Sequence, residues 1–423
     1  MAYALSRSRQ GATSSGTSLN AAQKLVYETL GSIRSGFLTV IDHEGRVEHF
    51  GDEKSTLKAE MIVTDPAFFG RTVRGGSLGF GESYMDGLWH ERNEDLTSLL
   101  GMLVADKLRT PMSRLLGLRV LLDDLLQNPI NAIRSQQNVA HHYDLSNEFF
   151  SLMLDGSMTY SCGILDEREA LASEENSLAA MQRRKYGLIS EKLSLMPGQS
   201  LIDIGCGWGG MLAHAATHHG VSGTGITLSK NQLAFARERF AREQLTNVSA
   251  QLTDYRDMTG SFDKLVSIGM LEHVGRSHYK PFAEKCAQLL KPGGIGLVHF
   301  IGMKDASGGE DPWIRKYIFP GGHLPDVATV IKPLQDAGMT IGHIENFKLH
   351  YAETLRYWKQ NVDRNRRQIR ALGSEFDTRF LRMWDYYLQA CEASFRYGKL
   401  ELYHILFSRS TQWTFPLRFR WRA

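Results

Sequence analysis

Apolar and polar residues alternate in regular blocks along the second half of the chain. From about residue 185 a helical pattern leads to Pro197-Gly198 and then to a short apolar strand, a run of glycines and another helical pattern. Further apolar strand-like runs follow at 221–229, 248–255, 262–270 and 293–302, with helical patterns between them. Strands that alternate with helices predict an α/β fold built on a parallel sheet.

The first hundred residues have a different pattern, which predicts a smaller α+β domain. Residues 35–52 alternate apolar and polar positions around Glu44-Gly45, as in a β-hairpin. Residues 71–90 are glycine-rich and then helical, and 96–108 have helical spacing. We expect a disordered leader over 1–28, an N-terminal domain over 29–125 and a catalytic domain over 126–423. Residues 119–154 are expected to form a helical connector between the two domains.

Composition narrows the class of protein without identifying it. The chain of 423 residues is 42% hydrophobic and 22% charged, as in ordinary globular proteins. Its net charge of +3, from 49 basic and 46 acidic residues, gives no indication of a nucleic-acid partner. The four cysteines are widely separated, which predicts a reducing, cytoplasmic location. No apolar run approaches the length of a membrane span, and no metal site is expected.

A glycine loop follows the first strand of the larger domain. In "LIDIGCGWGG", Gly205, Gly207 and Gly209 allow a sharp turn and a close approach to a ligand, and a helix begins directly behind them. Dinucleotide sites use a related loop, and tight strand–helix packing alone would also favour these glycines. Asp203 could accept an ammonium group, whereas Asp254 and Tyr255 could bind an adenine. This layout indicates a class I S-adenosylmethionine (SAM) site.

The second strand of this site departs from the common pattern. It ends with Thr227 and Leu228, where an acidic residue usually binds the ribose, and Gln232 could substitute one helical turn later. Cys206, inside the glycine loop, completes the residues that we expect around SAM.

Nine stretches occur in the order found in one enzyme family. They are "HHYDLSNEFF", "MTYSC", "LIDIGCGWGG", "TLSKNQ", "DYRD", "SIGMLEHVG", "DPWIRKYIFPGG", "YYLQACEASFR" and "LFSR". From about residue 135 to 410 the chain therefore resembles the cyclopropane-fatty-acyl-phospholipid synthases and their mycolic-acid-modifying relatives. A weaker resemblance covers about 35 to 110. The family resemblance implies methylation of a cis double bond in a phospholipid acyl chain, followed by closure of a cyclopropane ring.

The resemblance also implies a set of site residues. Family members hold a bicarbonate ion as the base, and the matching ligands here are Cys162, Glu272, His299, Tyr351 and the backbone of Ile301. Tyr160 and Ser161 match positions that touch SAM. Glu272 is expected either to accept the bicarbonate O–H or to orient His299. We interpret the neighbouring His273 as a packing or supporting residue. Cys391 matches a cysteine often marked as active, but the reaction needs no thiolate, so a structural role is favoured.

Two alternatives to ring formation stay open. The family usually has an aromatic pair after the cysteine that matches Cys162, whereas this chain continues "GILDERE". Some relatives convert the same alkene into a methyl- or methylene-branched chain, and the altered segment is compatible with such a product. An alternative of another class is a catalytically silent protein that only binds SAM or lipid.

The end of the chain suggests how the enzyme reaches a phospholipid membrane. "WTFPLRFRWRA" places Trp413, Phe415, Phe419 and Trp421 between arginines, as in interfacial anchors, although a locally packed basic tail is equally compatible. A second basic cluster at 363–370 is interpreted as a solvated helix face. We expect a homodimer, through the N-terminal domain, located peripherally on the inner face of the membrane.

Overall fold

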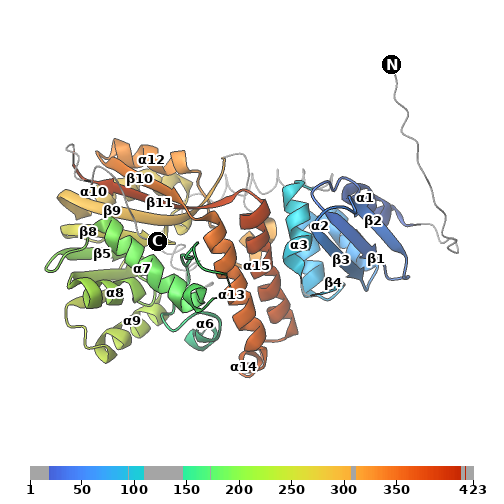
Figure 1. Ribbon diagram of the computed structural model, residues 1–423, viewed down its shortest axis with the longest axis horizontal. Coiled ribbons are helices and arrows are strands. Elements are labelled where there is room, and N and C mark those ends of the chain that lie inside the picture. The colour runs from blue at the N-terminus through green and yellow to red at the C-terminus, as the bar shows by residue number, and fades with distance from the viewer. Residues whose placement is uncertain are drawn as a thin grey trace, which may run out of the picture.

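The computed structural model describes residues 19–93, 95–108, 146–171, 173–305, 311–410 and 415. Figure 1 shows a larger unit around a long twisted sheet, and a smaller N-terminal unit beyond the helices α13 (Lys348–Arg364) and α15 (Thr378–Tyr397). The sequence predicted both the α/β class and the smaller α+β unit.

The larger unit is built on a seven-stranded sheet with the order β10-β11-β9-β8-β5-β6-β7. The strands are β5 (Ser200–Ile204), β6 (Ser222–Thr227), β7 (Val248–Leu252), β8 (Phe262–Ile268), β9 (Leu290–Met303), β10 (Thr340–Asn346) and β11 (Leu400–Ser408). Neighbouring strands from β7 to β9 are parallel, and β11 runs antiparallel to both β9 and β10. The five apolar runs predicted as strands thus all pair in one sheet.

Helices cover both faces of this sheet (Figure 1). One face packs against α7 (Leu178–Leu193), α8 (Gly210–His219) and α9 (Lys230–Arg242), and the other against α10 (Tyr279–Leu289) and α12 (Val327–Asp336). Alternating strand residues supply the two cores, so Leu201 faces the first set of helices and Ile202 the second. Burial on both faces explains why the central strands β5, β8 and β9 contain continuous apolar runs in the sequence, whereas the edge strand β7 is largely exposed.

The N-terminal unit is a four-stranded sheet with the order β2-β1-β3-β4. It comprises α1 (Ala21–Leu30), β1 (Phe37–Ile41), β2 (Val47–Gly51), β3 (Lys58–Val63), α2 (Ala67–Met85), β4 (Trp89–Glu91) and α3 (Leu96–Ala105). Strands β1 and β2 form the predicted hairpin, and Gly45 in its turn has a φ of +80°. Helix α1 corrects the predicted leader of 1–28, because Val26 and Tyr27 are buried in the core.

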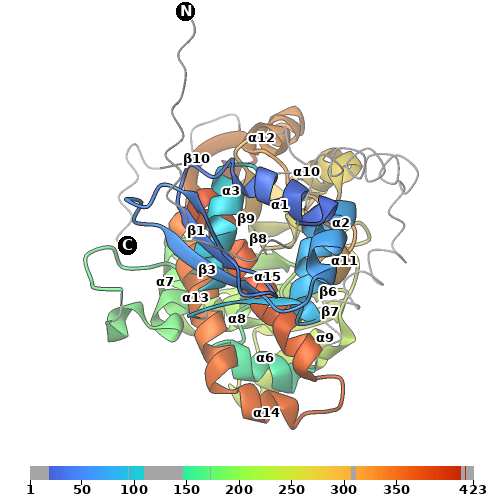
Figure 2. The same cartoon turned by 90° about the vertical axis from the view of Figure 1, so that its right-hand side faces the viewer.

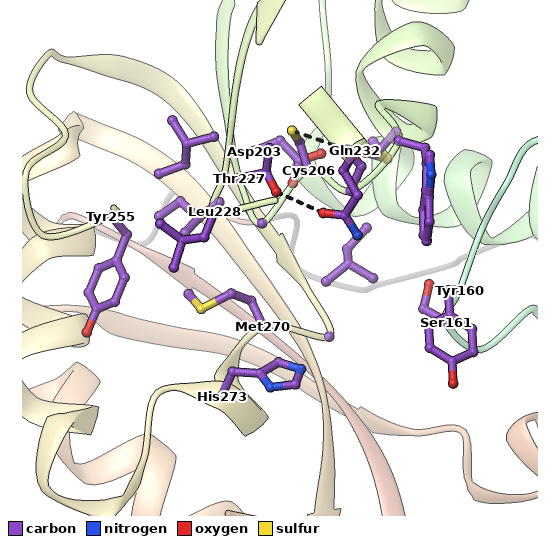
Figure 3. A pocket seen from close by; sticks show the side chains of 18 of the residues that line it. Tyr160, Ser161, Asp203, Cys206, Thr227, Leu228, Gln232, Tyr255, Met270 and His273 are labelled. Atoms are coloured by element: carbon purple, nitrogen blue, oxygen red, sulfur yellow. Dashed lines mark hydrogen bonds between the residues drawn. The ribbon is translucent and has the colours of Figure 1, made fainter. Parts of the chain in front are cut away.

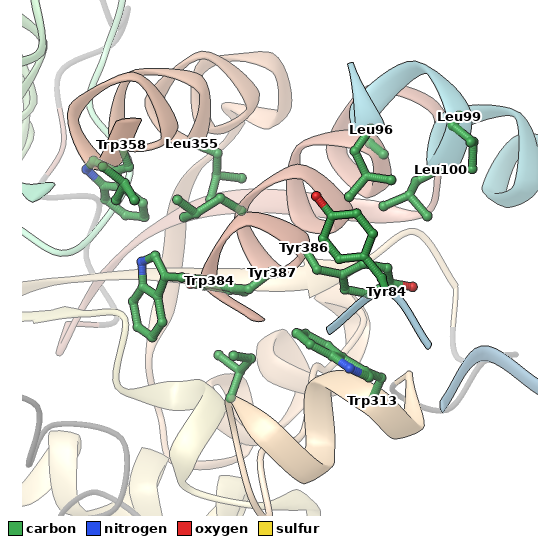
Figure 4. Close-up of a cluster of buried hydrophobic side chains, with 14 of the residues drawn as sticks. Tyr84, Leu96, Leu99, Leu100, Trp313, Leu355, Trp358, Trp384, Tyr386 and Tyr387 are labelled. Atoms are coloured by element: carbon green, nitrogen blue, oxygen red, sulfur yellow. The ribbon is translucent and has the colours of Figure 1, made fainter. Parts of the chain in front are cut away.

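An aromatic layer joins the two units. Helices α2 and α3 pack on α15, and α2 also contacts α11 (Pro312–Tyr317), as Figure 2 shows from the side of the N-terminal unit. In Figure 4 Tyr84 and Leu96 of the N-terminal unit lie beside Tyr386 of α15, with Trp313 below them. The Tyr84 hydroxyl donates a hydrogen bond to Asp385 over 2.5 Å. The interface therefore forms one continuous hydrophobic core with α13, α15 and α6 (Asn147–Met153).

Several predictions concern residues that the structure does not describe. The domain boundary at 125/126, most of the helical connector and, apart from Phe415, the aromatic and basic residues of the tail lie outside the described ranges. Phe415 itself is buried in the core on the α7 side of the sheet and lies against Gly342 of β10. The basic cluster forms the end of α13 and α14 (Arg366–Arg370), where four arginines, Arg364, Arg366, Arg367 and Arg370, line a surface hollow with Asp363. Among the described residues no helix combines the length and apolarity needed to cross a membrane.

Candidate active site

A pocket opens at the carboxyl ends of β5 and β8, where the strand order of the sheet reverses. This position is where open α/β sheets bind ligands. Most of the residues expected around SAM line it: Tyr160, Ser161, Asp203, Gly205, Cys206, Gly207, Thr227, Leu228, Gln232, Asp254 and Tyr255. Figure 3 shows them arriving from four separate segments of the chain.

The glycine loop has the backbone geometry that its sequence predicts. Gly205, Gly207 and Gly209 have φ values of +84°, +54° and +81°, which side chains of L-residues rarely allow. A Cβ on Gly205 would lie 2.9 Å from the Met270 side chain, so this glycine permits the close approach of the β8 loop. Gly209 does not line the pocket; it caps α8 and packs on Phe240. Two of the three glycines therefore form the pocket, and the third positions the helix behind it.

Asp203 supplies a buried carboxyl group at the base of this loop. It is 2% exposed, and its Oδ1 has no hydrogen-bond partner within the described structure. Burial raises its pKa to about 7, and the nearby Lys185 counteracts this shift in part. A cationic ligand group beside Oδ1 would satisfy the carboxylate and lower this pKa, as the ammonium of an amino acid would.

The far side of the pocket offers polar groups and an aromatic ring for a nucleoside. Thr227 Oγ1 donates to Gln232 Oε1 over 2.8 Å, which leaves the amide nitrogen of Gln232 directed into the pocket in Figure 3. Asp254 accepts two hydrogen bonds from the Arg256 guanidinium, over 2.9 and 2.6 Å, and these hold its pKa low against the effect of burial. The Tyr255 ring lies at the opposite end of the pocket from Tyr160.

Several lining residues are not among those that the sequence predicted, and four of them carry polar, aromatic or sulfur-containing side chains of interest. Lys185, Trp208, Arg256 and Met270 line the pocket, and so does His273, which was interpreted as a packing residue. Lys185 is fully buried on α7 and its ammonium donates to Ser161 Oγ over 2.8 Å. A lysine within a helical pattern gives no sign of this burial, whereas the position of His273 beside Glu272 was a usable signal.

The six residues expected to be catalytic lie next to this pocket rather than in its lining. Cys162 directly follows Tyr160 and Ser161, and Glu272 lies between Met270 and His273 in the short helix η2 (Leu271–His273). Tyr351 on α13 and Cys391 on α15 approach from the helical layer, and the Tyr351 hydroxyl interacts electrostatically with Tyr160, Cys162, Glu272 and Cys391. The fold thus brings together side chains that are up to 229 positions apart in the sequence.

Glu272 and His299 each present an unsatisfied atom to this region. Glu272 Oε1 accepts the backbone N–H of Ile301 over 2.7 Å, while Oε2 is buried without a partner in the described ranges. Burial raises the pKa of Glu272 to about 7. His299 Nδ1 lies 2.8 Å from Nε2 of His404, and His299 Nε2 is buried without a partner among the described residues. The partner that orients His299 is therefore His404 and not Glu272.

Burial disfavours the thiolate form of both cysteines in this region. Cys162 is fully buried, lies within 4.0 Å of Thr354 Oγ1, and has a pKa raised by burial. Burial also raises the pKa of Cys391 to about 12, which agrees with the expectation that no thiolate takes part.

The residues of the pocket and of the adjacent region fit two groups, SAM and a small oxyanion. The pocket combines an unpaired carboxylate, a glycine loop, an amide and an aromatic ring, as the amino-acid, ribose and adenine parts of SAM require. The adjacent region offers an acceptor at Glu272 and a ring nitrogen at His299, both buried and unsatisfied, which suit a small oxyanion that carries one proton. Within the described ranges no group of three or more His, Cys, Asp or Glu side chains could hold a metal ion.

Comparisons with known proteins agree on one family. The profile of mycolic acid cyclopropane synthetases matches residues 130–405. The cyclopropane-fatty-acyl-phospholipid synthase of Escherichia coli K12 is 36% identical over 364 residues, which cover 84% of this chain and 89% of that protein. Tuberculostearic acid methyltransferase UfaA1 of Mycobacterium tuberculosis is also 36% identical, over 84% of this chain and 82% of its own length.

Solved structures give the same result for the larger unit. The cyclopropane synthase MmaA2 from Mycobacterium tuberculosis superposes with a TM-score of 0.60 at 30% identity, covering 64% of this chain and 98% of that one. The mycolic acid cyclopropane synthase CmaA1, complexed with SAH and CTAB, superposes with a TM-score of 0.59 at 32% identity, with the same coverage.

Proposed function

Because this chain belongs to the mycolic acid cyclopropane synthetase family, we propose that it converts cis double bonds of phospholipid acyl chains into cyclopropane rings, with SAM as methyl donor and bicarbonate as base. Membership of the family makes it a SAM-dependent methyltransferase. The name of the Escherichia coli relative supports the phospholipid substrate. The observation that carries the proposal is the pair of buried, unsatisfied atoms, Glu272 Oε2 and His299 Nε2, beside the pocket.

Each part of the pocket has a task in holding SAM, which when bound supplies an electrophilic methyl group. Asp203 would accept the ammonium of its amino-acid part, and the Gln232 amide would donate to a ribose hydroxyl in place of the usual carboxylate. Asp254 and Tyr255 would bind the adenine. These contacts orient the ligand, since alignment with a weakly nucleophilic alkene is the main requirement of such a transfer.

The helical layer provides the dry, aromatic surroundings that a cationic acyl chain needs. The Tyr160 ring lies 4.9 Å from that of Trp358, and its hydroxyl lies 2.7 Å from that of Tyr387. Tyr351 packs on Phe395 at 4.8 Å. Aromatic faces stabilise positive charge, and exclusion of water prevents its capture as an alcohol.

Bicarbonate would be held by Cys162, Glu272, His299, Tyr351 and the backbone of Ile301, where it would supply the base for ring closure. The Ile301 N–H donates a hydrogen bond to Glu272 in this structure, so the amide and the carboxylate would lie together on one side of the ion. Glu272 Oε2 would accept the O–H of the ion, whereas His299 would donate to one of its oxygens.

A branched product is the second candidate, favoured by the segment after Cys162. A Cβ on Gly163 would lie 2.7 Å from that of Met181, and Ile164 and Leu165 are buried. This backbone packs against α7 and carries no aromatic side chain. Trp358 of α13 and Tyr160, which precedes the cysteine, supply aromatic faces instead, which favours the ring.

The remaining proposals concern the membrane. We expect the protein to act as a homodimer at the inner face of the membrane, with the aromatic and basic C-terminal residues as an anchor. Liposome flotation of the full chain, with and without residues 416–423, would test this anchor while leaving the buried Phe415 in place; equal binding of both would refute it.

The proposed reaction is tested with SAM and vesicles of cis-unsaturated phospholipid, followed by mass spectrometry of the fatty acids. We expect a gain of one methylene mass, and proton NMR signals of a cyclopropane without olefinic protons. Olefinic signals with the same added mass would establish the branched product. SAM binding without any mass gain would support a silent binding protein.

A further inference from the structure

A row of polar residues crosses three neighbouring strands behind the proposed bicarbonate site. Glu345 on β10 is the register partner of His404 on β11, and His404 is the register partner of His299 on β9. Residues directly opposite each other in antiparallel strands have side chains on the same face of the sheet. Helix α7 lies on this face and adds Lys192 to the row.

The four side chains are joined by direct contacts. Lys192 Nζ forms an ion pair with Glu345 and lies 3.1 Å from His404 Nδ1. His404 Nε2 lies 2.8 Å from His299 Nδ1. Lys192, His404 and His299 are each at most 1% exposed, whereas the Glu345 side chain is 35% exposed. The row thus runs from the protein surface to a buried nitrogen at the reaction site.

The direction of each hydrogen bond follows from the first one. A lysine ammonium can only donate. Burial lowers the pKa of Lys192, but the ion pair with Glu345 opposes this shift and favours the ammonium form, so His404 Nδ1 accepts. A neutral imidazole that accepts at Nδ1 carries its proton on Nε2, and His404 therefore donates to His299 Nδ1. By the same rule His299 carries its proton on Nε2, the atom that has no partner in the described structure.

We infer that Lys192 and His404 are positioning residues that hold His299 as an Nε2–H donor toward the reaction site. The inference rests on the proposed function, since it names what this donor faces: an oxygen of a small anion. In the other tautomer His299 would present a lone pair to that anion, which is repulsive. The row fixes which side chain donates and leaves proton acceptance to the anion and Glu272.

Both imidazoles stay neutral in these surroundings. Burial lowers the pKa of His299 well below its ordinary value, and the charges of Lys185 and Lys192 lower it further. Burial, Lys192, His299, Lys185 and His343 have the same effect on His404. Neutral imidazoles are required, because the tautomer argument applies only to rings with one proton.

The first measurement is made on the wild-type protein without substrate. In ¹⁵N–¹H correlation spectra of histidine-labelled protein, with His299 assigned from a His299→Gln variant, we expect His299 and His404 as Nε2–H tautomers. A Nδ1–H tautomer at His299 would overturn the inference, whatever the enzyme's substrate. This measurement is independent of the proposed function, which fails separately if no unsaturated lipid gains mass.

Variants test the consequence for turnover. Lys192→Met should lower kcat about 10- to 100-fold, the scale of a misaligned oxyanion donor, and should mix the His299 tautomers without changing the dissociation constant for SAM. His404→Phe should have the same effect. His404→Gln should retain more activity, because its amide nitrogen can donate from the position of Nε2. Wild-type kcat in both Lys192→Met and His404→Phe would overturn the inference.

Lys264→Met is the matched control. Lys264 is also a buried lysine, 6% exposed, but it lies at the start of β8, at the opposite end of the strand from the pocket. We expect its kcat and histidine spectra to match the wild type. A loss in this variant equal to that of Lys192→Met would show that burial of a lysine, and not the row, explains the effect.

Discussion

The two halves of the seven-stranded sheet build their sites in different ways. On the side of β5, β6 and β7, most ligand-binding groups come from loops directly after parallel strands. On the side of β9, β11 and β10, polar side chains project from directly opposed positions of neighbouring strands, and the hydrogen bond that each one makes fixes the tautomer of the next. The first half is organised to hold a ligand, whereas the second is organised to control protons.

The difference has a physical cause. Parallel strands end at a common edge, so their loops can surround a ligand as large as a nucleoside. The antiparallel strand β11 places His404 opposite His299 with both side chains on one face, which allows direct contact between the rings. A histidine that donates or accepts a proton needs a rigid, buried hydrogen-bond partner that fixes its tautomer, and it does not need a large cavity.

The largest effect is expected for Glu272→Gln, which removes the carboxylate where the two halves meet. We expect kcat to fall about 1000-fold, the upper range for losing one charged group that acts only in the transition state. SAM binding should stay within about twofold, since Glu272 lies outside the pocket lining. Single-turnover assays and calorimetric titration with SAM measure the two quantities.

A loss of SAM affinity as large as the loss of turnover would contradict this separation. Unchanged turnover would show that the reaction site lies elsewhere. Gln has nearly the volume of Glu, so a cavity does not explain either result.

The next effect is expected for Asp203→Asn, in the ligand-holding half. The dissociation constant for SAM should rise about 10- to 100-fold, the range for losing a buried charge-assisted contact. The kcat at saturating SAM should change far less. A fall in kcat without loss of affinity would mean that Asp203 belongs functionally to the other half.

These two residues also show what the sequence could predict. The glycine loop, Asp203 and the strand ends follow one another along the chain, so most of the ligand-holding half was predictable from spacing, whereas Tyr160 and Ser161 came from the family resemblance. The structure places eleven of the twelve expected residues around one pocket. The exception, Gly209, has the left-handed backbone that was expected, with a packing role. The α/β class was predictable for the same reason.

The proton-controlling half was predictable only through family resemblance, and then in part. His299 and Glu272 were named, but of the two roles expected for Glu272 the structure does not show the one that orients His299: His299 contacts His404, and Glu272 contacts the Ile301 backbone. His404 lies in an apolar strand and Lys192 in a helical pattern, 212 positions apart. Only the pairing of β11 with β9 and the position of α7 bring them together, and neither can be inferred from local pattern.

The smallest effect concerns stability, and it separates two buried glutamates by the sign of their pKa shifts. Burial raises the pKa of Glu272 to about 7. The pKa of Glu353 is lowered, because its ion pairs with Arg396 and Arg356 outweigh the opposite effect of burial. Folded protein therefore binds the Glu272 proton more tightly than unfolded protein does, and stability falls as pH rises from about 4.5 to 7. For Glu353 the sign is opposite, and its contribution is lost as pH falls.

When the pH rises from 5 to 8, the unfolding free energy of Glu272→Gln should accordingly increase by about 1–2 kcal/mol relative to that of wild type, because the amide removes the cost of a buried charge. Glu353→Gln, the matched control, should be less stable than wild type at pH 8, because two arginines lose their partner. Urea unfolding of the ligand-free proteins at both pH values measures the difference. If both variants lose stability alike at pH 8, Glu272 is not held in an uncompensated apolar setting. Glu272 would then have a cationic partner at the junction of the two halves. A carboxylate whose charge is stabilised in this way is a weak proton acceptor.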